Sequence, residues 1–368
     1  MNASVGARRA PRRAHRIDTA GAGILLALAA WAALSVVVNG GSPHLLYGAF
    51  LLFAVVYAAV RVVTLAHPWV APAAFTLAAG WLAISQWDIL FDGPLRSPLG
   101  YSNATGSFYL LAAFAALLVA VRARNVAIRV AAGAATVASA LVPWLNGTDT
   151  AAALTLLLPL ALLGQRGPRT IRRLIGFGAV LVGAALLATV AIGWAYEPDR
   201  DGALDGLLER TLSERRAELW HDALAIIGMR PIFGVGPGRF AVESPTALAD
   251  QDAVWVHQEF LQVGAETGLP GLALLLALVG WGFVRVRRHA VDSGAAVAAL
   301  GLAAVGVHAS VDYVWHFPAI VAATAVLAGT GSVAQPPTDH SRGRGSGPRR
   351  PTRSRPHLVG RTLRGPGR

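Results

Sequence analysis

The chain has 368 residues, of which 54% are apolar and only 14% are charged, with a formal net charge of +12. A soluble domain normally carries about 25% charged residues, so this composition excludes an ordinary soluble enzyme and indicates a membrane protein. All 32 basic residues are arginines, which cluster near the ends of the sequence and in short loops. That distribution argues against nucleic acid as a partner, because nucleic-acid-binding proteins gather positive charge on one face. The lack of cysteine excludes disulfides and Cys-ligated metals.

Apolar runs of about 20 residues, the length that crosses a bilayer as a helix, recur along the chain. They lie near 19–38, 44–65, 68–87, 105–121, 126–145, 149–164, 174–195, 269–285, 294–314 and 317–334. The sequence therefore predicts an all-α membrane protein with about ten transmembrane helices. One long extracytoplasmic loop between the seventh and eighth runs is expected to contain an amphipathic helix.

The arginines predict the orientation of these helices, because short cytoplasmic loops carry an excess of Lys and Arg. With the N-terminus inside, every Arg-dense loop falls on the cytoplasmic side. We therefore expect a multi-pass protein of the plasma (inner) membrane with both termini in the cytoplasm. The expected divisions are a basic cytoplasmic arm at 1–18, transmembrane helices at 19–195, the extracytoplasmic loop at 196–268, further transmembrane helices at 269–334 and a disordered, Arg-rich tail at 335–368. The tail either binds anionic lipid headgroups or is a solvated segment that keeps the last helix inside.

The long loop holds the main polar segment of the chain. Residues 203–229 carry apolar side chains at helical spacings, which predicts an amphipathic helix. Arg216 and Trp220 share a face of this helix, and a planar guanidinium beside an aromatic ring at a membrane surface suits a phosphate. The alternative is that Arg216 forms an ordinary ion pair with Glu214 or Glu218.

Two further features of the loop suggest chemistry. The sequence PIFGVGPGRF places glycines at 234, 236 and 238, which predicts an irregular turn whose N–H groups can face an anion. It matches neither a P-loop nor a dinucleotide fingerprint. His257 follows at the start of a short helix, where a histidine near an arginine can take a proton from a hydroxyl. The alternative is a hydrogen-bonded structural histidine.

A polar stripe is predicted near the C-terminal end of the apolar region. His308, Asp312 and His316 are each four residues apart and would share a face of one continuous helix, where they could bind a metal. Pro318 indicates that the helix ends near Trp315. We therefore prefer a polar helix end that faces the long loop, with Asp312 paired to an arginine of that loop, and we expect no metal site.

Three segments together resemble the O-antigen ligase and O-antigen polymerase superfamily of bacterial membrane glycan transferases. The first joins Arg216, four residues before a tryptophan, to the glycine turn, His257 and the Glu-x-Gly-φ-x-Gly segment at 266–271. The second is a Gly-Tyr-x-Asn-Ala segment that contains Asn103, and the third is His-Ala-Ser-Val-Asp-Tyr at 308–313. The remaining parts match only as hydrophobic helices.

The resemblance implies that a glycan passes from a polyprenyl-diphosphate donor to an acceptor hydroxyl on the outer face of the membrane, without a metal, nucleotide or other cofactor. It implies catalytic roles for His257 as base and for Arg216 as diphosphate ligand. The implied partners are the donor, a glycan, lipid or protein acceptor, and membrane lipids. The expected substrate-binding residues are Arg215, Arg239, Trp220, Asn103, Gly236, Glu266, His308 and Asp312.

The chain departs from the family pattern at one position that matters for phosphate binding. Many members carry a Ser-Arg pair in the region that spans 146–150 here, and the arginine, which contacts phosphate, is replaced by Thr150. Arg215, Arg239 or Arg96 would have to take its place. Two alternatives therefore remain open, namely a membrane transporter and a catalytically silent relative that only binds a lipid-linked glycan.

Overall fold

The computed structural model describes residues 9–90, 97–196, 214–250, 253–288 and 290–333, and every regular element in this part is helical. The elements are α2 (Arg9–Asn39), α3 (His44–Ala66), α4 (Val70–Ser85), α5 (Trp87–Leu90), α6 (Ser102–Arg122), α7 (Val126–Leu145), α8 (Asp149–Leu154), α9 (Leu157–Leu162), η1 (Leu163–Arg166), α10 (Pro168–Ala195), α12 (Glu214–Met229), α13 (Phe240–Glu243), α14 (Pro245–Ala249), α15 (Glu259–Arg288), α16 (Ser293–Ala309), η2 (Val314–His316) and α17 (Pro318–Gly331). The predicted tail at 335–368 lies outside the described residues.

Six of the described helices are long and apolar enough to cross a membrane, namely α2 from Asp18 onward, α3, α6, α7, α10 and α15. Three shorter apolar helices, α4, α16 and α17, pack among them. The prediction of an all-α membrane protein is confirmed in this part of the chain. The number of ten spans stays a prediction, because only six helices meet the requirements of length and composition.

Two apolar runs differ from their predicted form. The run at 149–164 is divided into α8, α9 and the 3₁₀ turn η1. Pro159 lies in this run and has no N–H to donate to the carbonyl of Thr155, which interrupts a continuous helix. Helix α15 joins the short helix of the loop to the next apolar run across a bend, where Gly268 adopts φ 74° and ψ −177°. Helix α2 begins at Arg9, inside the segment predicted as a basic arm.

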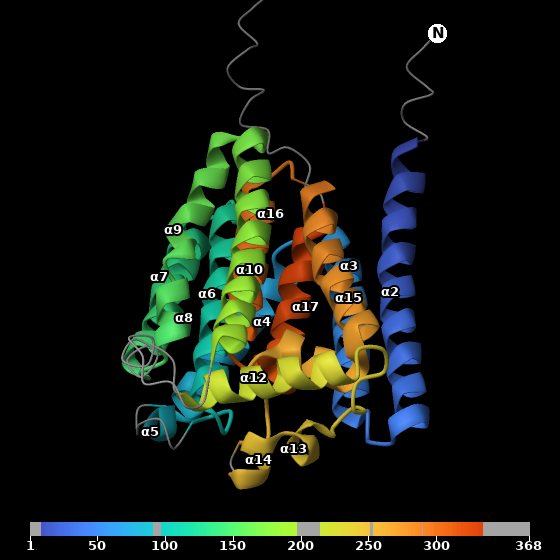
Figure 1. Cartoon of the computed structure of the whole chain (residues 1–368). Helices are drawn as coiled ribbons and strands as arrows, with labels where there is room; N and C mark the ends of the chain where they lie inside the picture. Colours follow the sequence, from blue (N-terminus) through green and yellow to red (C-terminus); the bar gives the residue numbers. More distant parts are fainter. Residues whose placement is uncertain (1–8, 91–96, 197–213, 251–252, 289, 334–368) are drawn as a thin grey trace, which may run out of the picture. The chain divides into compact units, whose positions relative to one another are not determined.

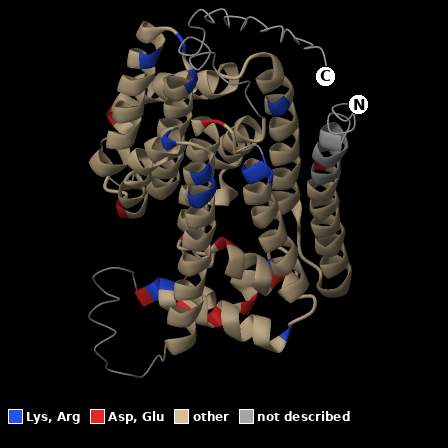
Figure 2. Ribbon diagram, turned by 90° about the horizontal axis from the view of Figure 1, so that it is seen from above, with Lys and Arg blue, Asp and Glu red and all other residues tan. Residues whose placement is uncertain are grey.

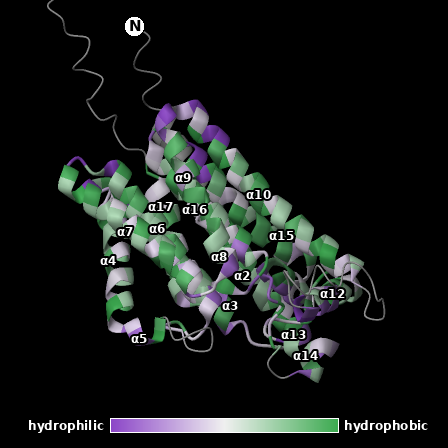
Figure 3. Cartoon of the chain, turned by 90° about the vertical axis from the view of Figure 1, so that its left-hand side faces the viewer, coloured by the Kyte–Doolittle hydropathy of each residue, from purple (hydrophilic) through white to green (hydrophobic). Residues whose placement is uncertain are grey.

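Helix α6 forms the centre of the bundle, and nearly all of its residues are buried. It packs against α7, α4, α16 and α17 (Figure 1). Alanine and glycine are frequent along α6 and α16. Such small residues allow the backbones of apolar helices to approach closely. The helices are green over most of their length in Figure 3, whereas hydrophilic residues gather near α12 and in the turns.

The ends of the bundle differ in charge. Asp18 of α2 binds Arg61 of α3 at 2.6 Å and Arg285 of α15 at 2.7 Å, which ties three helices together. Helices α12, α13 and α14 lie at the opposite end, beside the turn between α2 and α3 (Figure 1), where the N–H of Ser42 donates to the carbonyl of Pro237 at 2.8 Å. Acidic residues gather along the segment that contains α12 (Figure 2).

Candidate functional site

A cluster of polar side chains surrounds Asp312, which follows the end of α16 and has a side chain only 1% exposed. A buried carboxylate is costly unless it is paired and hydrogen-bonded. Its donors are the hydroxyl of Tyr101 at 2.7 Å, Nδ2 of Asn103, Nη2 of Arg216 at 3.2 Å, Nδ1 of His257 at 3.1 Å and the N–H of Tyr313 at 2.8 Å. We call these six residues the Asp312 cluster.

The Asp312 cluster draws on segments that are far apart in the sequence. Tyr101 and Asn103 lie at the start of α6, and Arg216 lies in the first turn of α12. His257 lies between α14 and α15, and Asp312 lies between α16 and η2. The predicted pair between Asp312 and an arginine of the loop is therefore present, and its partner is Arg216. The two residues expected to be catalytic meet on one carboxylate.

Electrostatics fix the protonation states in the Asp312 cluster. Burial opposes ionisation of Asp312, but the hydrogen bond from His257 and the positive charge of Arg216 outweigh it, so the pKa of Asp312 lies below its usual value. Burial, followed by the nearby charge of Asp312, raises the pKa of Tyr101 well above its usual value and the pKa of Tyr313 to about 12. Asp312 is therefore an anion at neutral pH, and both tyrosines keep their protons.

His257 is held in an unusual backbone conformation. It has φ of 54° and is the one non-glycine residue with positive φ among the described residues. Such a conformation costs about 1–3 kcal/mol and persists where neighbouring contacts enforce it. The indole N–H of Trp220 donates to the carbonyl of His257 at 3.3 Å, and the ring of Tyr313 meets its imidazole edge-on at 4.6 Å.

The arrangement around His257 fits a general base. Its Nδ1 faces the ionised Asp312, so the neutral ring carries its proton on Nδ1 and leaves Nε2 to accept one, as in other Asp–His pairs. Arg216 has five N–H donors and directs one nitrogen to Asp312. The side chains of His257 and Arg216 are each 20% exposed, so both reach beyond the buried carboxylate.

Trp220, His308 and Asn103, which were also expected to bind substrate, instead bond with other parts of the protein. Trp220 is fully buried, so it packs in the core and holds the backbone of His257, in contrast to the expected contact with substrate. The reason is that α12 turns this side of its amphipathic surface towards α10 and α15. His308 is also fully buried, and its Nδ1 lies 2.6 Å from the hydroxyl of Ser107. Asn103 is half-buried and bonds Asp312 and Tyr101.

The two further arginines expected to bind phosphate are engaged with carboxylates. Arg215 binds Glu218 at 3.1 Å and Asp250 at 3.1 Å. Arg239 binds Glu243 at 3.0 Å. Glu218 therefore pairs with Arg215 and not with Arg216, which binds Asp312 instead. Arg96, the third candidate substitute, lies outside the described residues.

The glycine turn has a structural role in this geometry. Gly234, Gly236 and Gly238 all have positive φ. The N–H of Gly236 donates to the carbonyl of Glu266 at 2.9 Å, and the N–H groups of Gly238 and Phe240 donate to the Glu266 carboxylate. The turn therefore directs these N–H groups to Glu266 of α15 instead of to a bound anionic ligand. A Cβ at Gly236 would lie 2.3 Å from the carbonyl oxygen of Gly40, so this close approach requires glycine.

The expected stripe of His308, Asp312 and His316 is absent. Helix α16 ends at Ala309, earlier than Pro318 suggested, and the three side chains then face different partners. His308 faces Ser107, Asp312 faces the cluster, and Nδ1 of His316 lies 3.2 Å from Glu259. No group of three potential metal-ligating side chains occurs in the described ranges.

Sequence reasoning missed Tyr101 and Tyr313, although both lie inside the segments that carry the family resemblance. Their rings stack at 4.9 Å between centroids and close one side of the cluster. In the region where the family arginine is missing, the buried side-chain amide of Asn146 has no hydrogen-bond partner within the described structure.

Residues 134–276 match the family model described as O-Antigen ligase. The match contains Arg216 and His257, whereas Asn103 and Asp312 lie outside it. No curated protein matches the chain.

Proposed function

We propose that the protein transfers or polymerises a glycan, and the match of residues 134–276 to the family model described as O-Antigen ligase supports this proposal. The donor is a glycan on a polyprenyl diphosphate, and the acceptor is a hydroxyl on the outer face of the membrane. The observation that carries this proposal is the meeting of Arg216 and His257 on the ionised, buried Asp312. A base and a phosphate ligand lie side by side, as this reaction needs.

In the proposed mechanism, Nε2 of His257 takes the proton of the acceptor hydroxyl as its oxygen attacks the anomeric carbon of the donor. The new glycosidic bond forms while the bond from the anomeric carbon to the diphosphate oxygen breaks. Negative charge develops on the departing polyprenyl diphosphate, where Arg216 stabilises it through the N–H groups that Asp312 does not use. Asp312 positions both groups and stabilises the imidazolium.

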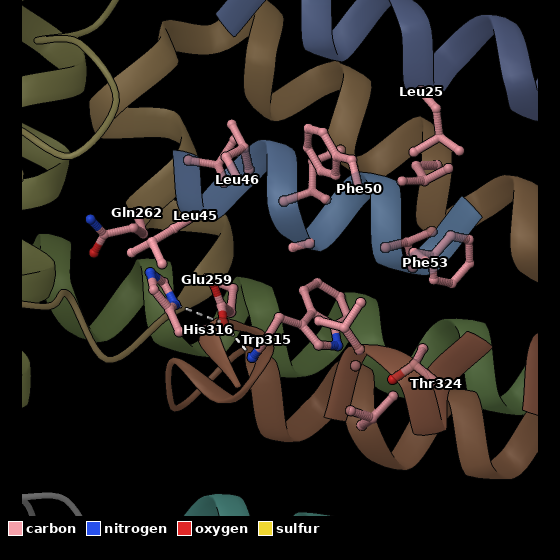
Figure 4. A pocket seen from close by; sticks show the side chains of 18 of the residues that line it. Leu25, Leu45, Leu46, Phe50, Phe53, Glu259, Gln262, Trp315, His316 and Thr324 are labelled. Carbon is pink, nitrogen blue, oxygen red and sulfur yellow. Dashed lines mark hydrogen bonds and ion pairs between the residues drawn. The ribbon is translucent and has the colours of Figure 1, made fainter. Parts of the chain in front are cut away.

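The proposal includes no metal or nucleotide, because Arg216 supplies the positive charge at the leaving group. A cavity of about 300 Å³ between α2, α3, α15, α16 and α17 is lined mainly by apolar residues, such as Phe53, Leu278 and Val279 (Figure 4). A transporter usually places ionisable groups near the middle of the bilayer, so this apolar lining favours the transferase over the transporter alternative. The silent relative remains the second candidate, because Thr150 replaces an arginine and both Arg215 and Arg239 already have carboxylate partners.

We also propose that the α12–α14 end is extracytoplasmic, with both termini in the cytoplasm and ten passes through the plasma membrane. This orientation is supported by Arg61 and Arg285, which pair with Asp18 at the other end of the bundle. Arginines are expected on the cytoplasmic side. The chain has no native cysteine, so single cysteines report topology directly. A cysteine at Leu248, which is 65% exposed, should react with an impermeant maleimide on intact cells, and one at His67 should react only after permeabilisation.

The activity test is transfer of a labelled polyprenyl-diphosphate glycan in proteoliposomes. His257→Ala and Arg216→Ala should each lower the rate by about 10²–10⁴-fold. Arg230→Ala and His67→Ala are matched controls, because both residues are exposed and neither belongs to the Asp312 cluster. Donor binding without transfer across a broad acceptor panel would favour the silent relative, and full activity of His257→Ala would refute the assigned base.

A further inference from the structure

Three arginines at the start of α10 form a charged group that takes no part in the Asp312 cluster. Arg169, Arg172 and Arg173 lie in the first two turns of this helix, and we call them the α10 arginines. The C-terminal end of α10 packs against α12, where a Cβ at Gly193 would lie 2.8 Å from Trp220. The α10 arginines therefore lie at the end of the bundle opposite α12 (Figure 1).

The positive charge of the α10 arginines is not neutralised within the described part of the chain. All three side chains are exposed, and none pairs with a carboxylate of a described residue. The described carboxylates at this end of the bundle already have other partners. Asp18 pairs with Arg61 and Arg285, and Asp292 pairs with Arg122 at 3.6 Å. A partner for the α10 arginines has to come from outside these residues.

The dipole of α10 adds to this charge instead of offsetting it. The N-terminus of a helix carries a partial positive charge, which favours acidic side chains, and the first turn of α10 has none. Arg287 and Arg288 are also exposed and unpaired in the described structure, but they lie in the last turn of α15, where the dipole favours cations. The two pairs of helix ends thus differ, because only α10 concentrates positive charge against its own dipole.

The length of α10 places these arginines at the level of lipid headgroups. The helix has 28 residues, which makes it about 42 Å long at a rise of about 1.5 Å per residue. The hydrocarbon core of a bilayer is about 30 Å thick, and about 40–45 Å with both headgroup layers. With the C-terminal end of α10 at the surface beside α12, its first two turns lie in the headgroup layer of the opposite leaflet.

The exposed face of α10 continues from these arginines into apolar surface. Arg169 and Arg173 are one turn apart, and Gly176, Val180 and Leu187 follow on the same face at helical spacings. Val180 and Leu187 are each 70% exposed, and a Cβ at Gly176 would meet no atom within 4 Å. Open space and then apolar side chains therefore follow the guanidinium groups, in the order in which acyl chains follow the phosphate of a lipid.

We propose that the α10 arginines and the apolar face below them bind an anionic phospholipid of the adjoining leaflet. A guanidinium fork matches two oxygens of a phosphate, and several of them together favour a headgroup with net negative charge. A zwitterionic headgroup carries its own cation, which the arginines repel. One acyl chain lies along Gly176 and Val180. This site is separate from the proposed transfer reaction, and its occupant is not a substrate.

The experiment measures lipid binding to the full chain in a nonionic detergent by native mass spectrometry. The probes are phosphatidylglycerol and phosphatidylcholine with identical acyl chains, and soluble glycerol phosphate is the competitor. We expect phosphatidylglycerol to bind about tenfold more tightly than phosphatidylcholine. Glycerol phosphate at the same concentration should not displace it, because the acyl chain contributes to binding. Displacement by glycerol phosphate would instead assign the arginines to a free anion and overturn the lipid site.

Two triple variants remove the same charge from the same end of the bundle. The first replaces the α10 arginines by glutamine, and the control carries Arg124→Gln, Arg287→Gln and Arg288→Gln, all at exposed residues without an ion pair in the described structure. The α10 variant should lower the affinity for phosphatidylglycerol by about tenfold, and the control by less than about twofold. Thermal unfolding and size-exclusion profiles verify folding, and Arg173→Gln alone serves if the α10 variant does not fold.

Replacement of the α10 arginines by lysine separates a binding site from a role in topology. Topology requires positive charge in the loop, which lysine supplies equally, whereas the planar fork is lost. The lysine variant should bind phosphatidylglycerol several-fold more weakly than the wild type. Wild-type affinity in this variant, or an equal loss in the two glutamine variants, would show diffuse surface charge in place of a site. Equal binding of the two lipids by the wild type would also overturn the proposal.

Discussion

Two aspartates among the described residues each pair with two basic side chains, and the way they are buried separates the candidate reactive site from a structural one. Asp312 is 1% exposed, while its partners Arg216 and His257 are each 20% exposed. Asp18 is 25% exposed, and its partners are Arg285, which is 2% exposed, and Arg61, which is 24% exposed. In the first group the carboxylate is enclosed and both basic side chains reach outward, where a ligand can meet them. In the second group the carboxylate itself is exposed and one guanidinium is enclosed, and the ion pairs join α2, α3 and α15.

The largest effect is expected for Asp312→Asn. The Asn amide would offer an N–H to Nδ1 of His257 and favour the tautomer with its proton on Nε2, which removes the base. We expect transfer to fall by about 10³–10⁴-fold, as in other Asp–His pairs. The assay is glycan transfer in proteoliposomes at equal amounts of folded protein. Retention of most activity by this variant would contradict the positioning role of Asp312.

Asp18→Asn provides the other half of the comparison. It leaves the buried guanidinium of Arg285 without its carboxylate, which should lower the free energy of unfolding by about 1–3 kcal/mol. The rate of transfer per folded molecule should not change, because the Asp18 ion pairs lie at the opposite end of the bundle from α12 and the Asp312 cluster. Thermal unfolding in detergent measures the first effect, and the transfer assay measures the second. A large loss of transfer with unchanged stability would show that the two aspartates do not differ as we infer.

The helices and several residues of the candidate site could be predicted from the sequence, but the way these residues meet in space could not. Apolar runs predicted the helices because burial in hydrocarbon requires a fixed length, and short motifs identified Asn103, His257 and Asp312. The division of the run at 149–164 followed from Pro159, which hydrophobic length does not reveal. Trp220 was expected to face a ligand because it shares a helix face with Arg216, but only packing shows which side of α12 is enclosed.

A smaller effect on transfer is expected for Trp220→Phe. The variant keeps the apolar ring in the core but loses the hydrogen bond to the carbonyl of His257, where the backbone has φ of 54°. A slight displacement of the base should lower kcat by about tenfold, with little change in KM. Trp281→Phe is a matched control, because Trp281 is also largely buried but lies in α15, away from His257. An equal loss in both variants would indicate general destabilisation and would contradict a specific positioning role.

The smallest effect is expected for Tyr101→Phe. Phenylalanine keeps the stacking on Tyr313 and removes one hydrogen bond to Asp312, which retains Asn103, Arg216 and His257 as donors. A hydrogen bond to a charged group contributes about 1.5–3 kcal/mol, but a carboxylate with several remaining donors should lose less, so transfer should fall only several-fold. Because the Asp312 carboxylate loses one hydrogen-bond donor in this variant, its pKa should rise towards its usual value. Activity should then be lost at a higher pH than in the wild type as the medium is acidified, since protonated Asp312 no longer holds Arg216 and His257 in place. A pH–rate profile with an unshifted acid limb would show that Tyr101 contributes packing alone, and that the remaining donors keep Asp312 ionised.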